Sequence, residues 1–352
     1  MGLEAHLIVN EESSHSGQTR IVRKAYFEHP DYVPLLESAY QGWQQLEQIT
    51  GRQYYHPVGL AYFGKQGHPL LQSVRNSSEK YHIPLEKWDV QQSAKALPDF
   101  SIPITYETIF EPEAGFVCTD QVIAAYHQLA TDQGAHFREH EPVIHWEVKH
   151  DSVIVHTAKE QYTCQKLILT GGAGNRELLP AEMGSLKVTR QLISWVRPRN
   201  DQHFKLGQLP CWVLAPDDEK GIFYGFPMIP ETYGGIPALK VAHHFPGELY
   251  HESDLTPAII ETEKQKIRRM MDAFLPDVFT EFVDVTSCLY TYTEDENFII
   301  DFVPETNQSV ITAAGFSGHG FKFVPVIGEV LRDLVIHEQT DQPVRFLKAN
   351  RN

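Results

Sequence analysis

The 352-residue sequence predicts a mixed α/β fold. Three features indicate this fold class. Closely spaced strands over 142–170 end in the glycine-rich TGGAG, amphipathic helices lie between shorter strand-like runs, and a second glycine-rich turn, FSGHGFK (316–322), separates a strand from a helix. The length allows two domains or one large interleaved domain.

The first expected helix is marked by the spacing of its apolar residues. Residues 31–49 place Leu36, Tyr40, Trp43 and Leu46 at helical intervals. One face of this segment is therefore expected to pack against a core.

Two further helices are expected from their terminal residues. Over 119–134, Thr119 is expected to cap the first turn and Gly134 to end the helix. Over 256–276, Thr256 stands at the cap position, and a proline follows at the first helical position, where its missing N–H costs nothing.

Strands are expected where short runs of β-branched and aromatic residues stand between turn residues. These runs are 59–64, 142–148, 151–157, 165–170, 297–304 and 309–315. The second and third join through a polar KHD turn, and the fourth follows closely. After the last strand and the FSGHGFK turn, a helix is expected through Val330 and Leu334.

Composition excludes several classes of function. The formal charge of −16 argues against a nucleic-acid partner, because phosphate binding requires clustered lysine and arginine. The four cysteines form no CxxC pair, so neither a metal site nor a disulfide framework is indicated. With no signal peptide and no apolar run long enough to span a bilayer, we expect no membrane association and a cytoplasmic location.

Two glycine-rich stretches are candidates for nucleotide binding. GGAGNREL (171–178) follows a strand, but the dinucleotide fingerprint requires a third glycine where Glu177 stands, counting from Gly172. A tight turn is therefore the better interpretation. FSGHGFK lies between a strand and a helix, so either it presents backbone N–H groups to an anion or a ring edge, or it is a structural turn.

Glu4 ends a short strand fragment at the start of the chain. In a dinucleotide-binding βαβ unit, an acidic residue at the end of the second strand holds a ribose hydroxyl. Only three residues precede Glu4, whereas the preceding strand, glycine turn and helix need about 30. Taken alone, Glu4 is best interpreted as a solvated terminal residue.

Six segments of the sequence together resemble a known family. In order, they are SSHSGQTRIVRKAYFEHPDYVPLL, IFEPEAGFV, GIFYGFP, ALKVAHH, CLYTYTEDENFIID and AAGFSGHGFKF. They resemble the monomeric sarcosine oxidase and N-methyltryptophan oxidase family, within the D-amino-acid-oxidase-like FAD-dependent oxidoreductases. The resemblance covers essentially the whole chain from Gly2, and CLYTYTEDENFIID and GFSGHGFKF are its most specific segments.

The resemblance implies a Rossmann-like FAD-binding domain interleaved with a mixed-sheet substrate domain, with the first βαβ element truncated. The FAD-binding part is expected over 1–55, 115–185 and 285–352, and the substrate-binding part over 56–114 and 186–284. Glu4 takes the place of the family's ribose-binding acid, and the GxGxxG segment before it is missing. We expect truncation rather than decay, because the other site residues match the family.

The implied reaction is oxidation of a secondary amino acid, N-methylated or cyclic, to an imine, with O2 reduced to hydrogen peroxide and FAD as the cofactor. The expected partners are the amino acid and O2, and a monomer is favoured. Two alternatives stay open. One is a flavin-free remnant without oxidase activity, and the other is an amine dehydrogenase that uses another electron acceptor.

The resemblance also assigns substrate-binding residues. Arg23 and Lys322 match the family's carboxylate-binding pair, and a guanidinium suits bidentate binding. Tyr224, His244 and Tyr290 match residues that surround the substrate. Without the resemblance, surface charge would explain the two cations and core packing the aromatic residues.

Two further cations and one cysteine match groups close to the flavin. Lys240 matches the oxygen-activating lysine, and Arg20 would lend positive charge to the reduced ring. Cys288 matches the covalent attachment point of the flavin, although a lone cysteine is more often an inert core residue. The expected catalytic set is Arg20, Tyr224, Lys240 and His244.

The resemblance also assigns residues to the cofactor site. They are Glu4, Ser14, His15, Thr19, Arg20, Val143, Cys288, Gly318, His319, Gly320 and Lys322. His15 is followed by Ser16, where the family often has a second histidine, so substrate preference is expected to differ. The loops over 190–250 are expected to set the pocket volume and thereby the substrate side chain.

Overall fold

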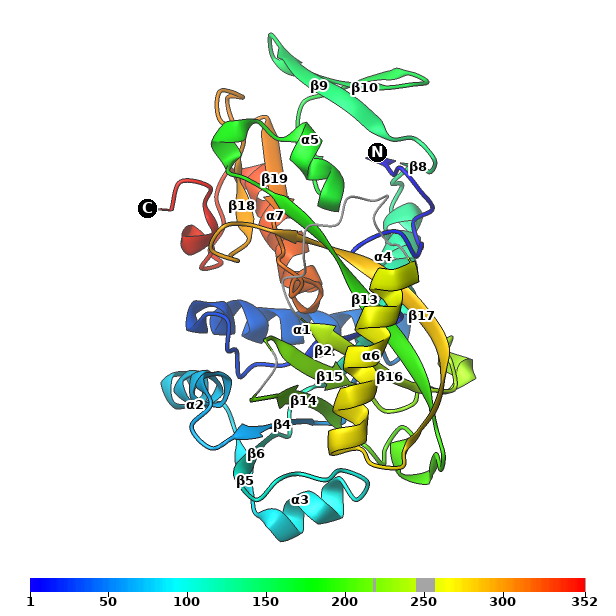
Figure 1. Cartoon of the computed structure of the whole chain (residues 1–352). Helices are drawn as coiled ribbons and strands as arrows, with labels where there is room; N and C mark the ends of the chain where they lie inside the picture. Colours follow the sequence, from blue (N-terminus) through cyan, green and yellow to red (C-terminus); the bar gives the residue numbers. More distant parts are fainter. Residues whose placement is uncertain (218–219, 245–256, 352) are drawn as a thin grey trace.

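The computed structural model describes residues 1–217, 220–244 and 257–351, and it confirms a mixed α/β fold. Figure 1 shows a lower half built around one large sheet and an upper half of smaller sheets and helices. Two long strands, β13 and β17, run from the upper half into the lower one.

An eight-stranded mixed sheet dominates the lower half. Its strands, in order, are β17 (Phe279–Tyr292), β13 (Lys187–Pro198), β16 (Leu239–His244), β15 (Ile222–Gly225), β14 (Cys211–Ala215), β4 (Leu60–Lys65), β6 (Tyr106–Glu111) and β5 (Glu86–Trp88). Neighbours run antiparallel except β14 and β4, which are parallel. Helix α6 (Pro257–Phe274) packs against this sheet through Ile267, Met270 and Met271.

The upper half contains the short parallel pairings typical of α/β architecture. Strand β12 (Leu167–Leu169) pairs in parallel with β19 (Val310–Ala314), which pairs antiparallel with β18 (Ile299–Phe302). At the start of the chain, β1 (Gly2–Leu3) pairs in parallel with β8 (Phe137–Arg138). Glu4 therefore directly follows a strand.

A three-stranded meander differs from the sequence prediction. It consists of β9 (Val143–Lys149), β10 (Ser152–Thr157) and β11 (Gln161–Cys164), and β11 was not expected. The predicted strand at 165–170 exists only as β12, which leaves the meander and joins β19. Leu169 is buried in that position, so the pairing of β12 with β19 removes this apolar side chain from water.

The remaining elements complete the frame. A small sheet joins β2 (Thr19–Val22), β7 (Gly115–Cys118) and β3 (Tyr55–His56). The other helices are α1 (Val33–Thr50), α2 (Pro69–Tyr81), α3 (Val90–Ala96), α4 (Thr119–Asp132), α5 (Asn175–Leu178) and α7 (Val324–His337). None of the described helices is long and apolar enough to cross a membrane.

The predicted helices are present, but one predicted cap is wrong. Thr119 is the first residue of α4, and its hydroxyl donates to Asp120 (3.2 Å) instead of capping the helix, while Cys118 occupies the cap position. Strand β7 runs directly into α4, which places Thr119 one residue too far along the helix. Thr256, the other predicted cap, lies outside the described residues.

The core brings the two ends of the chain together. Apolar residues of α1, among them Leu36 and Ala39, share one cluster with Val326 and Val330 of α7. The boundary expected at residue 285 falls inside β17, which pairs with β13 throughout its length. The structure therefore links the two proposed parts through a continuous strand pair.

Candidate active site

A strained turn before β2 surrounds the ammonium of Lys240. Gly17 and Gln18 both have positive φ, 88° and 68°. The turn points its oxygens at Lys240 Nζ, which donates to Gly17 O (2.5 Å), Thr19 O (2.9 Å) and Thr19 Oγ1 (3.0 Å). Lys240 lies on β16 and is only 2% exposed, so this buried side chain is not a surface charge.

The three oxygens around Lys240 Nζ can form hydrogen bonds with both the charged and the neutral form of this side chain. Burial lowers the pKa of Lys240 well below its ordinary value, and the positive charge of Arg20 lowers it further. An ammonium would donate to all three oxygens. A neutral amine would donate to the two carbonyls and accept from the hydroxyl of Thr19.

Arg20 joins the same turn to the loop before it. Its Nη1 donates to Thr19 O (2.8 Å) and its Nη2 to Ser14 O (2.7 Å). Burial and then the charge of Arg20 lower the pKa of His15 to about 4, so His15 is neutral at physiological pH. The predicted residues Ser14, His15, Thr19 and Arg20 thus form one connected unit.

Arg23 is buried and paired with an acid. The Nη2 of Arg23 donates to both carboxylate oxygens of Glu28 (2.7 and 2.6 Å), and its Nη1 donates to Ala25 O (3.1 Å). Burial alone would raise the pKa of Glu28, but the charge of Arg23 lowers it to about 2. The ring of Phe27 stacks on the guanidinium at 3.8 Å.

Lys322 reaches the same place from the other end of the chain. Its Nζ lies 5.3 Å from the centre of the Tyr26 ring, and the guanidinium carbon of Arg23 lies 4.5 Å from that centre. Lys322 Nζ also donates to His319 O (2.7 Å). Burial and then the charge of Arg23 lower the pKa of Lys322 to about 7. The two predicted carboxylate-binding cations therefore converge on one ring.

Three aromatic side chains from the large sheet lie next to one another. The imidazole Nδ1 of His244 is 3.4 Å from the hydroxyl of Tyr290, and a side-chain hydrogen bond joins Tyr290 to Tyr224. Burial lowers the pKa of His244 to about 4, and the charges of Glu28, Lys322 and Arg23 also act on it. This polar group is therefore close to the pair of cations.

The glycine-rich turn after β19 packs closely on these aromatic residues. Gly318 has φ 78°, and a side chain there would overlap the ring of Tyr290. A side chain at Gly320 would overlap Phe316. Glycine is therefore required at both predicted positions by close packing, which also brings His319 and Lys322 to the site.

Cys288 lies on β17, opposite Gln191 of β13 and on the same face as Tyr290. It is 1% exposed, and burial raises the pKa of its thiol, while the charges of Arg20 and Lys240 oppose the rise. The thiol is thus within the electrostatic reach of both predicted catalytic cations.

Comparison with known proteins identifies the family. The family model for FAD dependent oxidoreductases (DAO) matches residues 2–334. Monomeric sarcosine oxidase of Streptomyces avermitilis is 33% identical over 353 residues, which cover 100% of this chain and 91% of the relative. N-methyl-L-tryptophan oxidase of Yersinia pestis is 30% identical over 325 residues, 91% of this chain and 84% of the relative.

This chain belongs to the FAD dependent oxidoreductase family. Solved structures agree in fold: an open form of NikD, described as an unusual amino acid oxidase, has a TM-score of 0.84 at 22% identity, covering 98% of this chain and 90% of NikD. L-proline dehydrogenase from P. horikoshii has a TM-score of 0.82 at 17% identity, and the match covers 99% of this chain and 89% of the dehydrogenase. Membership implies FAD as the cofactor.

The polar groups around the Ser14–His15 loop fit a bound FAD. His15 Nε2 and Asn175 Nδ2 are buried, and neither has a hydrogen-bond partner within the parts of the chain that the structure describes. The two segments meet, since Ser14 Oγ lies 4.0 Å from where a side chain on Gly172 would begin. Buried polar atoms of this kind are normally satisfied, so they suit the phosphate and hydroxyl groups of a dinucleotide, which can both accept and donate.

Two residues predicted to bind the cofactor, Glu4 and Val143, lie apart from the Ser14–His15 loop. Leu3, next to Glu4, packs with Val143, the first residue of β9, around buried Val153 and Leu169. The Glu4 carboxylate accepts a hydrogen bond from the backbone N–H of His6 (2.9 Å). The roles of Glu4 and Val143 at the cofactor are proposals, supported by the position of Glu4 directly after β1 and by the packing of Val143 and Leu3 on the same cluster.

Sequence reasoning missed four residues of the site: Tyr26, Glu28, Glu111 and Asn175. Glu28 is the ion-pair partner of Arg23. Glu111 accepts from the backbone N–H groups of Lys24 (2.6 Å) and Ala25 (3.2 Å), which fixes the segment after Arg23. Tyr26, Glu28 and Glu111 stand within segments that resemble the family, whereas Asn175 follows the GGAG turn.

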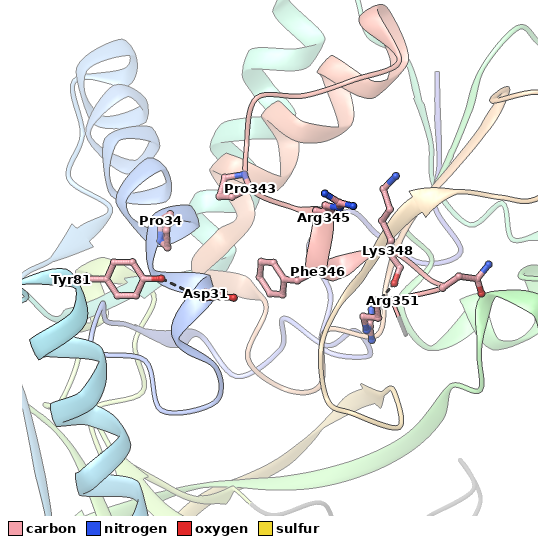
Figure 2. A pocket seen from close by; sticks show the side chains of 9 residues that line it. Asp31, Pro34, Tyr81, Pro343, Arg345, Phe346, Lys348 and Arg351 are labelled. Carbon is pink, nitrogen blue, oxygen red and sulfur yellow. Dashed lines mark hydrogen bonds between the residues drawn. The ribbon is translucent and has the colours of Figure 1, made fainter.

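An open surface hollow of about 730 Å³ is a separate feature (Figure 2). None of the predicted site residues lines it. Asp31 there is bound by Lys80 and Tyr81, and Arg351 by Asp295, so those charges are already paired. The hollow does not contribute to the candidate active site.

Proposed function

We propose that this protein is an FAD-dependent oxidase of N-methylated or cyclic secondary amino acids, which it converts to imines while reducing O2 to hydrogen peroxide. The convergence of Arg23 and Lys322 on the Tyr26 ring supports this proposal most strongly. Arg23, Lys322 and the ionised Glu28 together carry a net positive charge when Lys322 is protonated, which suits a substrate carboxylate, and curated relatives are named for the oxidation of sarcosine and N-methyl-L-tryptophan.

Each part of the site has a role in this reaction. FAD, when bound, supplies the two-electron acceptor. Arg23 and Lys322 bind the substrate carboxylate. Tyr224, Tyr290 and His244 surround the amine, and the low pKa of His244 keeps its imidazole neutral, so that it can accept a hydrogen bond from the amine.

The second pair of cations serves oxygen reduction. Arg20 and Lys240 place positive charge, or exchangeable protons, where O2 gains electrons. Lys240 can lose and regain a proton without leaving an unsatisfied donor, because the Thr19 hydroxyl can either accept from it or donate to it. Cys288 is the proposed site of covalent attachment to the flavin.

The protein is proposed to act on a small amino acid with O2 as a monomer, in the cytoplasm. The four cysteines are free, which suits a reducing compartment. We retain the proposed division into an FAD-binding part over 1–55, 115–185 and 285–352 and a substrate-binding part over 56–114 and 186–284. Strand β17 crosses the expected boundary at residue 285, which supports a position for Cys288 and Tyr290 near the junction of the two proposed parts.

The test is an absorption spectrum and a peroxide assay on the purified protein after incubation with FAD. The expected result is a flavin spectrum that bleaches on anaerobic addition of sarcosine, N-methyl-L-tryptophan or proline, with peroxide released in air. Flavin binding without bleaching by any secondary amino acid would contradict the proposal. Bleaching with electrons passed to a dye but no peroxide would indicate a dehydrogenase, and no flavin binding a flavin-free remnant.

A further inference from the structure

The ring of Tyr26 is a shared platform under the two cations that face the proposed substrate. Tyr26 is fully buried, with Arg23 at 4.5 Å and Lys322 at 5.3 Å from its centre. A cation over an aromatic face is attracted by the ring, and the attraction grows when both are shielded from water. The position of this ring therefore affects both cations together.

A hydrogen bond to His319 fixes the direction of that ring. The Tyr26 hydroxyl lies 2.5 Å from His319 Nδ1, and His319 Nε2 lies 3.1 Å from the carbonyl oxygen of Glu296. A carbonyl oxygen only accepts, so Nε2 holds the proton and Nδ1 accepts from the Tyr26 hydroxyl. Burial lowers the pKa of His319 to about 3, consistent with this neutral tautomer.

The same histidine also holds Lys322. Its backbone carbonyl accepts a hydrogen bond from Lys322 Nζ at 2.7 Å. His319 thus contacts Tyr26 through its ring and Lys322 through its main chain. The ring of Tyr26 is enclosed on other sides by Tyr32 (5.2 Å between centres) and Phe323 (5.6 Å), so it has little freedom to turn.

We propose that Tyr26 and His319 act as a coupled pair of positioning residues, which set the spacing of Arg23 and Lys322 for a substrate carboxylate. This inference rests on the proposed function. Neither side chain needs to touch the reacting atoms, because each acts through the two cations. The consequence is that loss of the Tyr26–His319 hydrogen bond weakens carboxylate binding more than it slows the oxidation of bound substrate.

The first test compares Tyr26→Phe with Tyr32→Phe in the flavin-loaded protein. Tyr26→Phe keeps the ring but removes its tether, so KM is expected to rise about three- to tenfold, the effect of one neutral hydrogen bond, with kcat within about twofold. Tyr32→Phe also removes a hydroxyl from a fully buried tyrosine, one that accepts a hydrogen bond from Phe298 N (3.0 Å). Among the described residues, neither Arg23 nor Lys322 lies over the Tyr32 ring. The KM of Tyr32→Phe is expected to stay unchanged.

The second test is a double-mutant cycle with a rescue variant. His319→Ala is expected to raise KM as Tyr26→Phe does, and the double variant is expected to be no worse than either single one, because both remove the same bond. His319→Asn offers an amide oxygen near the place of Nδ1, and it is expected to restore part of the loss. The affinity of the oxidised, flavin-loaded protein for acetate, measured by thermal shift, is expected to fall in His319→Ala and in the double variant and to recover in part in His319→Asn.

Equal KM changes in Tyr26→Phe and Tyr32→Phe, or fully additive effects in the cycle, would overturn the inference and assign the pair a purely structural role. Failure of the proposed function looks different. In that case the wild-type protein itself would show no amino-acid oxidation, and acetate affinity would not depend on Arg23.

Discussion

Two buried cations of the active site are stabilised in different ways. Arg23 is held by the carboxylate of Glu28, whereas Lys240 is held by three neutral oxygens of the Gly17–Thr19 turn. The pKa of Arg23 is raised, mainly by Glu28 against the effect of burial, and the pKa of Lys240 is lowered by burial. A buried cation with an acidic partner keeps its charge, and one with neutral partners is ready to give up its proton.

This difference matches the proposed division of work. Arg23 must stay positive to bind a carboxylate, so an acidic partner that keeps it charged is useful, whereas Lys322, whose ammonium donates to a neutral carbonyl, has a charge that depends on pH. A group beside which O2 is reduced benefits from a proton that can move. The predictions below test this comparison, from the largest expected effect to the smallest.

The largest effect is expected at the ion pair. Arg23→Met leaves Glu28 buried without its partner, which is expected to destabilise the fold by about 3 kcal/mol and to abolish saturation with an amino acid. Chemical denaturation measures the stability. Arg23→Met/Glu28→Gln removes the stranded charge, so it should recover at least half of the lost stability without recovering substrate binding. Equal stability of the single and double variants would show that Glu28 is not charged.

A smaller loss of stability is expected at Lys240. Lys240→Met removes the three hydrogen bonds of Lys240 Nζ, at a cost of about 1–2 kcal/mol, since Gly17 O still accepts from Thr19 N and Thr19 O from Arg20. Reoxidation of the reduced flavin by O2 is expected to slow at least about 100-fold, the size seen when one charge-stabilising group is lost, while anaerobic bleaching by the substrate continues. Stopped-flow absorbance separates the two steps. Lys205→Met, an exposed lysine, is the matched control, and retained peroxide release in Lys240→Met would favour a dehydrogenase.

The pH dependence of binding is expected to report Lys322. Because its pKa is lowered to about 7, from 10.5, the ammonium is lost as pH rises through 7, and KM should increase between pH 7 and 9. In the same window the unfolded chain binds the proton and the folded chain does not, so the free energy of unfolding from this residue rises with pH. Arg20, Arg23 and Glu28 are the charges that act on Lys322.

Lys322→Arg is the control for this pH effect. Arginine stays charged across the range, so the KM of this variant should be independent of pH between 7 and 9. A pH-dependent KM in Lys322→Arg equal to that of the wild type would assign the titration to another group.

The smallest effect on stability is expected at Cys288. Cys288→Ala removes one sulfur from the core, and the free energy of unfolding should fall by about 1 kcal/mol or less. The flavin should then separate from the protein on acid precipitation, whereas it should stay with wild type and with Cys164→Ala. Release of flavin from all three proteins would show that no thioether forms.

Local structure was largely predictable from the sequence. The helices α1, α4, α6 and α7 follow from apolar spacing and terminal residues. The strand β12 was expected, but its departure from the meander was not, because the choice of partner depends on β19, which lies far away in the chain. Thr119 failed as a cap because β7 passes into α4 without an intervening loop.

The site was predictable mainly from family resemblance. Nothing in the residues alone shows that Arg23 and Lys322 meet, since folding joins them through the packing of α1 on α7. Glu28 and Glu111 were missed because acids are common on surfaces, and only the fold shows that Glu111 is buried behind the segment after Arg23 and that Glu28 is partly buried against Arg23. The approach of the Ser14–His15 loop to the Gly172 turn, with a buried and unpartnered polar atom on His15 and another on Asn175 among the described residues, is likewise visible only in three dimensions.

The most direct test of the central claim compares an N-methyl amino acid with its neutral amide as substrates. If Arg23 and Lys322 bind a carboxylate, kcat/KM for sarcosine should exceed that for sarcosinamide by about 100-fold or more, and the ratio should fall to within about tenfold in Arg23→Met. Equal kcat/KM for acid and amide in the wild-type protein would contradict the account.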